Sequence, residues 1–205
     1  MIRTVIFDYG GVVTDGGGGG AVDERLASRL DITIDRASQL LKGTWGPLVR
    51  GESTEEDFWQ KLETAFKKPI PEDRRDIFMS WDDMQPRPQI LKLIGELKQG
   101  GYTVGLLSNV IPRSEEFLRT HGVYELFDPC ILSCKLGLAK PDKDIYDKLL
   151  NALGDVEPST VLYIDDQERC LIPARELGLQ TVLAGTGEQT AEAVRALMKL
   201  RQQAD

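Results

Sequence analysis

Polar side chains follow three apolar stretches of the chain, at the points where each stretch ends. Asp8 follows VIF, and Ser108 with Asn109 follows GLL. Asp165 and Asp166 follow LYI. If these stretches are neighbouring parallel strands, their carboxyl ends meet at one edge of a sheet, and the three carboxylates share a small space. Carboxylates so close repel one another unless a cation joins them. Ligands that are all oxygen atoms predict a hard ion, so we expect Mg²⁺ here.

One lysine would add the positive charge that this group lacks. Lys140 lies in LAKPD, just before a predicted helix. A lysine beside a carboxylate nucleophile can hold it ionised and can also bind phosphate oxygens. Ser108 and Asn109 offer a hydroxyl and an amide to the same oxygens. We therefore expect Asp8, Ser108 and Lys140 to be catalytic. Ser108, Asn109 and Lys140 are expected to bind the substrate.

The elements that would position these residues alternate along the chain. Short apolar runs predict buried parallel strands at residues 4–7, 103–107, 130–132, 161–164 and 181–183. Amphipathic helices are expected from Pro88 to the glycines at 100 and 101, and over residues 142–153, 169–177 and 188–202. This alternation favours right-handed crossovers. We therefore expect an α/β fold with a three-layer, doubly wound parallel sheet.

A long segment between the first two strands breaks the alternation. Residues 16–20 are consecutive glycines, which cannot hold a regular element. Helical patterns follow, and the clearest begins at Ser53, which with Glu56 predicts a capping box. Such an insertion lies above the carboxyl edge of the sheet, where these folds bind ligands. We expect a small all-helical cap over residues 15–86, with the glycines as its hinge, and a core of residues 1–14 and 87–205. A helical decoration without a binding role is the alternative.

Aromatic and basic residues of the insertion are candidates for substrate selection. Trp45, Trp59 and Trp81 could wall a substrate pocket, although packing inside the insertion is the commoner role for such residues. Arg50 could face a substrate anion or lie in solvent.

Composition narrows the classes of partner. The net charge of -8 and the pI of about 4.8 argue against nucleic acid and anionic membrane surfaces. No apolar run approaches the roughly 20 residues that cross a bilayer, and MIRTVIFD leaves no room for a signal peptide. The cysteines (Cys130, Cys134 and Cys170) lack zinc-site spacing, so we expect free thiols in a reduced cytoplasm. The oligomeric state cannot be inferred from the sequence.

The order of these motifs resembles the haloacid dehalogenase-like superfamily over nearly the whole chain. FDYGGVVTD, LLSN, LGLAKPD and YIDD are similar to its four motifs. The resemblance implies a Rossmann-like core, the small helical cap of subclass I, and Asp8 as a nucleophile that forms an aspartyl-phosphate. It implies Mg²⁺ held by Asp8, Asp165 and the backbone carbonyl of Gly10, with Asp166 holding the metal's water shell or a nearby group. Ser108 would bind the phosphate. RGESTEEDFW also resembles a group that includes bacterial sugar-1-phosphate phosphatases. The resemblance thus implies a Mg²⁺-dependent phosphatase for a small phosphorylated metabolite.

Gly10 departs from the family pattern. Family phosphatases usually have an aspartate there, which protonates the leaving group and later activates water. General acid–base catalysis contributes typically about 10²–10⁴-fold to a rate. One interpretation is a substrate whose leaving group needs little protonation, such as an anomeric sugar phosphate or an acyl phosphate, since the sugar-1-phosphate group tolerates the same change. Asp15 could replace the missing acid, although a solvated loop position is its simpler role.

Two alternatives to a phosphatase stay open. A 2-haloacid dehalogenase needs no acid because halide leaves unprotonated, but family dehalogenases use no metal, and the pair Asp165 and Asp166 indicates that one is kept. A non-enzymatic phosphoryl-binding or regulatory module is the other alternative. Cys170 favours it slightly because the family often has Asn or Asp there, although this cysteine could simply pack beneath the loop.

Overall fold

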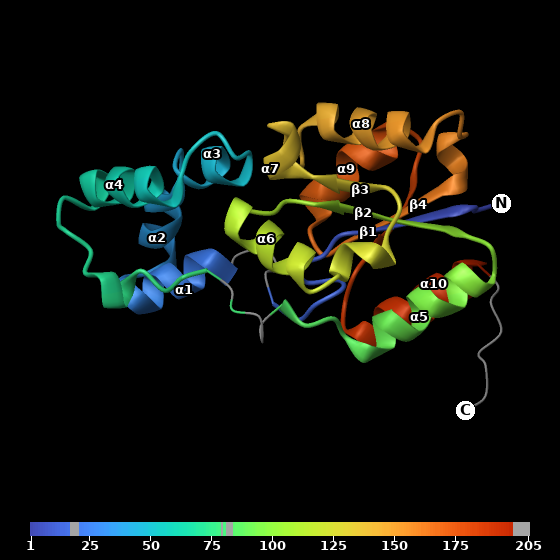
Figure 1. Cartoon of the computed structure of the whole chain (residues 1–205), viewed down its shortest axis with the longest axis horizontal. Helices are drawn as coiled ribbons and strands as arrows, with labels where there is room; N and C mark the ends of the chain where they lie inside the picture. The colour runs from blue at the N-terminus through green and yellow to red at the C-terminus, as the bar shows by residue number, and fades with distance from the viewer. Residues whose placement is uncertain (17–20, 79, 81–83, 199–205) are drawn as a thin grey trace.

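The computed structural model describes residues 1–16, 21–78, 80 and 84–198, and it places a helical body beside an α/β core (Figure 1). Strand order in the five-stranded sheet is β3-β2-β1-β4-β5, and every pairing is parallel. The strands are β1 (Thr4–Phe7), β2 (Thr103–Ser108), β3 (Cys130–Leu132), β4 (Val161–Asp165) and β5 (Gln180–Leu183). Because β1 lies between β2 and β4, the residues that end these three strands meet at one edge.

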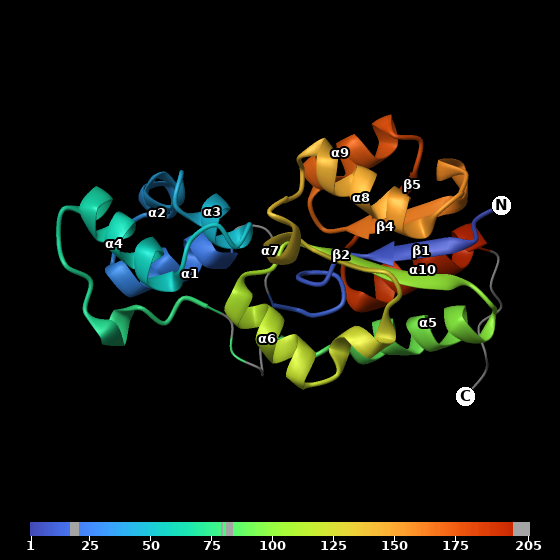
Figure 2. The ribbon, with the colours of Figure 1, turned by 45° about the horizontal axis from the view of Figure 1, so that its top comes forward.

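Helices cover both faces of the sheet, as Figures 1 and 2 show. One face carries α5 (Pro88–Gln99), α6 (Pro112–Thr120) and α10 (Gly187–Met198), and the other carries α8 (Lys143–Leu153) and α9 (Glu168–Glu176). The side chains of β1 alternate between the two layers: Val5 and Phe7 join the first core, and Ile6 joins the second. The predicted three-layer, doubly wound α/β fold is therefore confirmed.

Two helices of the core were not predicted from the sequence. They are α6 and the short α7 (Ser133–Leu136), which lie between β2 and β3 and directly after β3. The 3-10 turns η3 (Val123–Leu126) and η4 (Pro158–Thr160) complete the connections. The helix expected over residues 188–202 is described to Met198, so its last part lies outside the described residues.

Where the structure describes it, the inserted segment forms four helices with a hydrophobic core of their own. These are α1 (Ala21–Leu30), α2 (Ile34–Leu41), α3 (Trp45–Val49) and α4 (Glu55–Phe66), followed by η1 (Glu72–Arg74). Phe58 and Leu62 are fully buried in this core, and Trp59 is nearly so. The core also takes in Ile111 and Ala139 from the α/β body.

The predicted capping box of α4 is wrong by one residue. Thr54, not Ser53, is the N-cap: its hydroxyl accepts from the Asp57 amide, and the Asp57 carboxylate accepts from the Thr54 amide. Ser53 and Glu56 fit the same pattern, but Ser53 Oγ is buried without a hydrogen-bond partner among the described residues.

The chain leaves and re-enters the core at one place. Thr14 forms bridges with both Gly10 and Pro86, and the Arg87 amide donates to the Val13 carbonyl at 2.7 Å. Arg87 Nε lies 2.6 Å from Asp15 Oδ1. The segments on the two sides of the insertion are therefore fastened together beside the loop that follows β1.

A second contact fastens the insertion to α7. Ser133 Oγ donates to the Val49 carbonyl at 2.8 Å and accepts from the Val110 amide at 2.9 Å. Nearby, Arg50 pairs with Asp142 at 2.6 Å. Arg50 therefore bridges the insertion and the core, and its charge is paired with a carboxylate of the protein. A Cβ added to Gly51 would lie 2.5 Å from the Cys134 carbonyl oxygen, which shows how closely the backbones approach.

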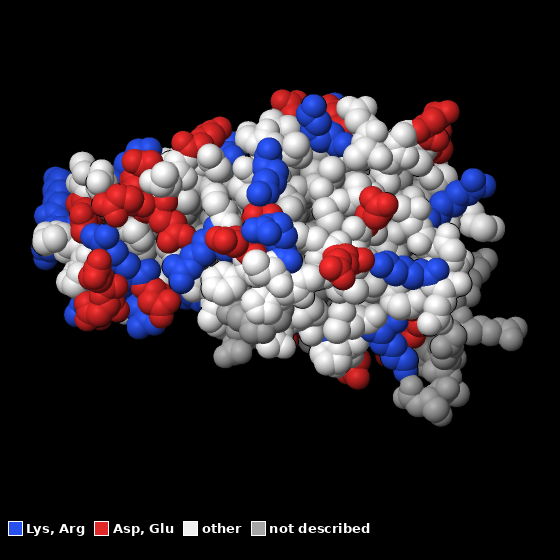
Figure 3. All heavy atoms as spheres, in the orientation of Figure 1, with Lys and Arg blue, Asp and Glu red and all other residues white. Residues whose placement is uncertain are grey.

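Charges are mixed on the surface. On the face drawn in Figure 3, acidic and basic side chains are interspersed, most densely over the insertion. That face carries no continuous basic stripe of the kind that binds nucleic acid. Among the described residues, no helix combines the length and apolar character that a membrane span requires.

Candidate active site

The predicted carboxylates meet at the carboxyl edge of the sheet. Asp8 directly follows β1, and its amide donates to the Ile164 carbonyl of β4 at 2.9 Å. Asp165 ends β4, and Asp166 follows it. One oxygen from each of the three side chains lies within 4.8 Å of the others. Asp8 and Asp165 are 5% and 0% exposed, so their carboxylates are held away from water.

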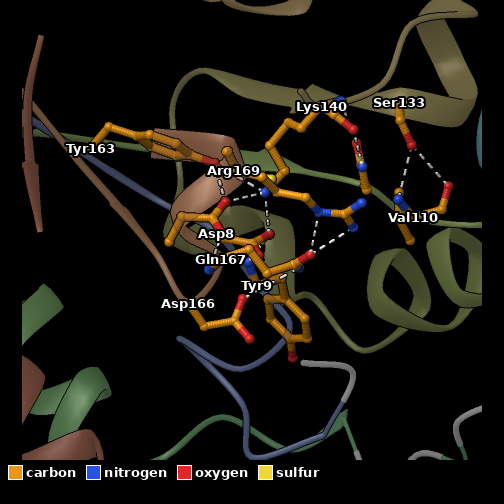
Figure 4. Close-up of polar contacts among 12 residues, drawn as sticks. Asp8, Tyr9, Val110, Ser133, Lys140, Tyr163, Asp166, Gln167 and Arg169 are labelled. Atoms are coloured by element: carbon orange, nitrogen blue, oxygen red, sulfur yellow. Dashed lines mark hydrogen bonds and ion pairs between the residues drawn. The ribbon is translucent and has the colours of Figure 1, made fainter. Parts of the chain in front are cut away.

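Lys140 supplies a cation between the two buried carboxylates (Figure 4). Its Nζ lies 2.9 Å from Asp8 Oδ1 and 2.7 Å from Asp165 Oδ2. Asn109 fixes the backbone of this lysine, because its amide nitrogen donates to the Lys140 carbonyl and its oxygen accepts from the Lys140 amide, each at 2.9 Å. The Asn109 side chain thus positions the lysine, and its predicted binding of substrate stays a prediction.

Burial and mutual charge set the ionisation of this group. Burial raises the pKa of Asp8 to about 7, against the attraction of Lys140 and with the repulsion of Asp165. Burial alone would lower the pKa of Lys140, but Asp8 and Asp165 together raise it above its ordinary value. Lys140 therefore stays charged at neutral pH.

Tyr163 is a member of the site that the sequence analysis missed. Its hydroxyl donates a short hydrogen bond to Asp165 Oδ2 and accepts from Lys140 Nζ at 3.0 Å. The signal was present, since residues two apart on a strand point to the same face, and Tyr163 precedes Asp165 by two. A buried tyrosine there fixes the carboxylate and the lysine relative to each other.

Two donors hold one oxygen of the Asp8 carboxylate. The Tyr9 amide donates to Asp8 Oδ1 at 2.7 Å, and Lys140 approaches the same atom. Among the described residues, no hydrogen bond to Oδ2 is present. The carboxylate is therefore oriented through Oδ1, and Oδ2 is left for a ligand or an electrophile.

A cavity of about 340 Å³ opens above these residues, between the core and the insertion. The core contributes Asp8, Tyr9, Gly10, Ser108, Asn109, Val110, Ile111, Ser114, Leu118, Lys140, Gln167 and Arg169. The insertion contributes Ala21, Val22, Asp23, Arg25, Leu41, Trp45, Val49, Ile77, Phe78 and Met84. Ser108, which ends β2 and is 4% exposed, thus lies at the predicted place.

Arg169 and Gln167 are further lining residues that the sequence analysis did not select. Both Arg169 Nε and Nη2 donate to Gln167 Oε1, at 3.0 and 2.7 Å, as Figure 4 shows. They come directly after Asp165 and Asp166, at the sheet edge. This closeness in sequence to the acidic pair is the signal that could have indicated them. Arg169 adds a second cation, beside Lys140, to the core side of the cavity.

Among the described residues, neither Asp15 nor Asp23 is a simple substitute for an acid at Gly10. Asp15 is paired with Arg87, has a side chain that is 89% exposed, and does not line the cavity. Asp23 does line it, but its carboxylate accepts a short hydrogen bond from Ser38. Asp15 is therefore the solvated loop residue of the simpler interpretation.

The acidic group suits a hard divalent cation. Asp8, Asp165 and Asp166 present only oxygen donors. Asp165 Oδ1 already accepts from the Gln167 amide at 2.8 Å, which orients this carboxylate toward the other two. The donor set fits Mg²⁺, and the part of the Gly10 carbonyl in this set stays a prediction.

The remaining candidate residues differ in where they lie. Trp59 packs in the core of the insertion, while Trp45 lines the cavity; Trp81 lies outside the described residues. Cys170 is 1% exposed in the first turn of α9, where burial raises the pKa of its thiol to about 12. The glycine hinge lies outside the described residues except for Gly16.

Known proteins resemble this chain over most of its length. It is 24% identical to the sesquiterpene phosphatase astK of Aspergillus oryzae, covering 98% of this chain and 95% of that protein. It is 27% identical to the D-ribitol-5-phosphate phosphatase of Bacteroides thetaiotaomicron, covering 88% and 91%. Two further curated relatives are matched over only 19% of their own length, one by 51% of this chain and the other by 96%.

Solved structures share the fold. A haloacid dehalogenase family enzyme of Bacteroides thetaiotaomicron, crystallised as a magnesium complex, superposes with a TM-score of 0.73 at 23% identity, over 95% of this chain and 98% of that one. The family model for haloacid dehalogenase-like hydrolases matches residues 2–178. The chain therefore belongs to the haloacid dehalogenase-like hydrolase family.

Proposed function

We propose that this hydrolase is a Mg²⁺-dependent phosphatase that acts on a small phosphorylated metabolite through an aspartyl-phosphate on Asp8. The observation that carries the proposal is the orientation of Asp8: Oδ1 is held by Lys140 and the Tyr9 amide, while Oδ2 carries no hydrogen bond among the described residues. The names of two relatives, both phosphatases, support the same class of reaction.

In the proposed reaction, Asp8 Oδ2 attacks phosphorus and the bond from phosphorus to the leaving-group oxygen breaks, with its electron pair going to that oxygen. Water then attacks the aspartyl-phosphate, releases inorganic phosphate and restores Asp8. Ser108 and Lys140 bind the phosphate oxygens, and Asn109 holds Lys140 in position. Mg²⁺ bound by Asp8, Asp165, Asp166 and the Gly10 carbonyl would neutralise charge on the phosphate.

Gly10 limits which substrates turn over well. Without a side-chain acid, the leaving group departs as the anion or takes a proton from water, so weakly basic leaving groups are favoured. Anomeric sugar phosphates and acyl phosphates meet this condition. Residues 15–86 form the cap in this proposal, and residues 1–14 and 87–205 form the catalytic core.

The test is hydrolysis of p-nitrophenyl phosphate and a panel of phosphorylated metabolites, with Mg²⁺ and with EDTA. We expect metal-dependent release of phosphate that Asp8→Asn abolishes and that Asp15→Asn, at an exposed position, leaves intact. Glucose-1-phosphate should be a better substrate than glucose-6-phosphate, and the opposite order would contradict the leaving-group argument. Chloride release from 2-chloropropionate in EDTA would establish the dehalogenase instead. Mg²⁺-dependent binding of phosphate without turnover would establish a binding module.

A further inference from the structure

The cavity has two chemically different halves. Its floor carries the charged residues of the sheet edge, whereas the part formed by the insertion is lined by Val22, Leu41, Trp45, Val49, Ile77 and Phe78. These side chains come from α1, α2, α3 and the segment after η1, so three of the four helices described in the insertion present apolar atoms to the same space. Ile111 extends this surface from the core side.

Aromatic packing holds the apolar half in place. Trp45 and Phe78 stack with ring centroids 6.4 Å apart and an interplanar angle of 18°. Both rings also contact Phe58, at 6.1 and 5.9 Å, and Phe58 is fully buried. Because aromatic rings supported in this way lose little freedom on binding, the surface is ready to receive an apolar group.

The insertion offers few partners for a polyhydroxylated ligand. Among the described residues it contributes to the lining, only Asp23 and Arg25 are charged, and both are engaged by neighbours, Asp23 by Ser38. Sugar hydroxyls that enter the cavity lose water and need replacement hydrogen bonds. Methylene groups that enter it gain from leaving water.

We propose that the organic part of the substrate is an apolar aryl or acyl group, so that the substrate is an aryl or acyl phosphate and not a sugar phosphate. This rests on the proposed phosphatase activity and chooses among the weakly basic leaving groups that Gly10 favours. The phosphate sits at Asp8, and the apolar body fills the space beneath Trp45 and Phe78.

A series of 4-alkylphenyl phosphates, from methyl to butyl, tests the proposal. The leaving-group basicity is nearly constant along this series, so only the apolar area changes. We expect kcat/KM to rise about fourfold per methylene until the cavity is full, and to exceed that for glucose-1-phosphate. The matching 4-alkylphenyl phosphonates, which are not hydrolysed, should inhibit with a Ki that falls by the same factor.

A variant pair locates the effect. Val22→Thr exchanges a methyl for a hydroxyl in the cavity at constant size, and should flatten the dependence on chain length for both kcat/KM and Ki. Val156→Thr makes the same exchange at another half-buried position outside the cavity and should keep the dependence. Equal kcat/KM along the series, or faster hydrolysis of glucose-1-phosphate, would overturn the inference while leaving the phosphatase proposal standing. Absence of Mg²⁺-dependent turnover on the whole series would overturn both.

Discussion

Replacing Lys140 by methionine would leave two buried carboxylates without their cation. The Lys140 side chain is 2% exposed, and its Nζ lies 2.9 Å from Asp8 Oδ1 and 2.7 Å from Asp165 Oδ2. The side chains of Asp8 and Asp165 are 7% and 0% exposed. Methionine has a similar length but no charge, so the packing is kept and the ion pairing is lost. Removing one partner of a buried pair typically costs about 3–5 kcal/mol. For a chain of this size, about 1 kcal/mol shifts Tm by about 2–4 °C, so we expect Tm to fall by about 6–20 °C.

The assay is thermal unfolding of wild type and Lys140→Met in EDTA, so that no divalent cation takes the place of the ammonium. Lys143→Met is the matched control. Lys143 is 62% exposed and pairs with Asp147 one helical turn along, a kind of pair worth about 0.3–0.5 kcal/mol. A loss of stability in Lys140→Met no larger than in Lys143→Met would refute the view that Lys140 neutralises the site.

The pH dependence of the same variant gives a second check. Without Lys140, the repulsion between Asp8 and Asp165 is uncompensated, so the pKa of Asp8 should rise above about 7. Protonation then relieves the repulsion, and the destabilisation should be larger at pH 8 than at pH 6. A loss that is equal at both pH values would show that packing, not charge, is responsible.

Three further predictions follow from local structure. Burial raises the pKa of Asp8 to about 7 from 3.8, so in EDTA the folded chain holds a proton that the unfolded chain has lost, and stability falls as pH rises through 7. The stability of Asp8→Asn relative to wild type should therefore increase from pH 5 to pH 8. A constant difference in unfolding free energy would contradict this. Gly51→Ala puts a Cβ 2.5 Å from the Cys134 carbonyl oxygen, whereas the Cβ of Gly43→Ala meets nothing within 4 Å. The two glycines have similar positive φ angles, +69 and +84, so they differ mainly in this contact. Only Gly51→Ala should increase the radius of gyration in small-angle scattering and lower kcat/KM. Thr54→Ala should cost about 1 kcal/mol in denaturant unfolding, and a larger loss for Ser53→Ala would mean that the cap is misassigned.

The catalytic edge of the sheet was predictable because strand ends are encoded locally. An apolar run followed by Asp8, or by Asp165 and Asp166, gives both the strand and the direction of the polar groups. The observed strands β1 and β3 have the predicted bounds, and β2 extends by one residue to Ser108. The metal-ligating and substrate-binding roles of these residues stay predictions.

The missed features depend on tertiary contacts. The helix α6 has few apolar residues and buries Glu115, whose carboxylate lies 3.0 Å from Lys135 Nζ. Its sequence therefore lacks a repeated series of apolar residues at helical spacing. Trp45 and Trp59 have the same side chain at nearby positions, yet one lines the cavity and the other lies in the core of the insertion. Only the arrangement of the four helices distinguishes them.

Tyr9 connects Asp8 to the segment that returns from the insertion. Its amide holds Asp8, and its hydroxyl donates to the Met84 carbonyl, just before the bridge between Thr14 and Pro86. Because Tyr9 contacts both, a displacement of the returning segment near Met84 would act on the residue that holds the Asp8 carboxylate. Under the phosphatase proposal, a ligand that holds the insertion in place would therefore also fix the direction in which Asp8 attacks. Discrimination between substrates should then appear in kcat as well as in KM, because a poorly fitting group leaves the nucleophile misdirected even after it has bound.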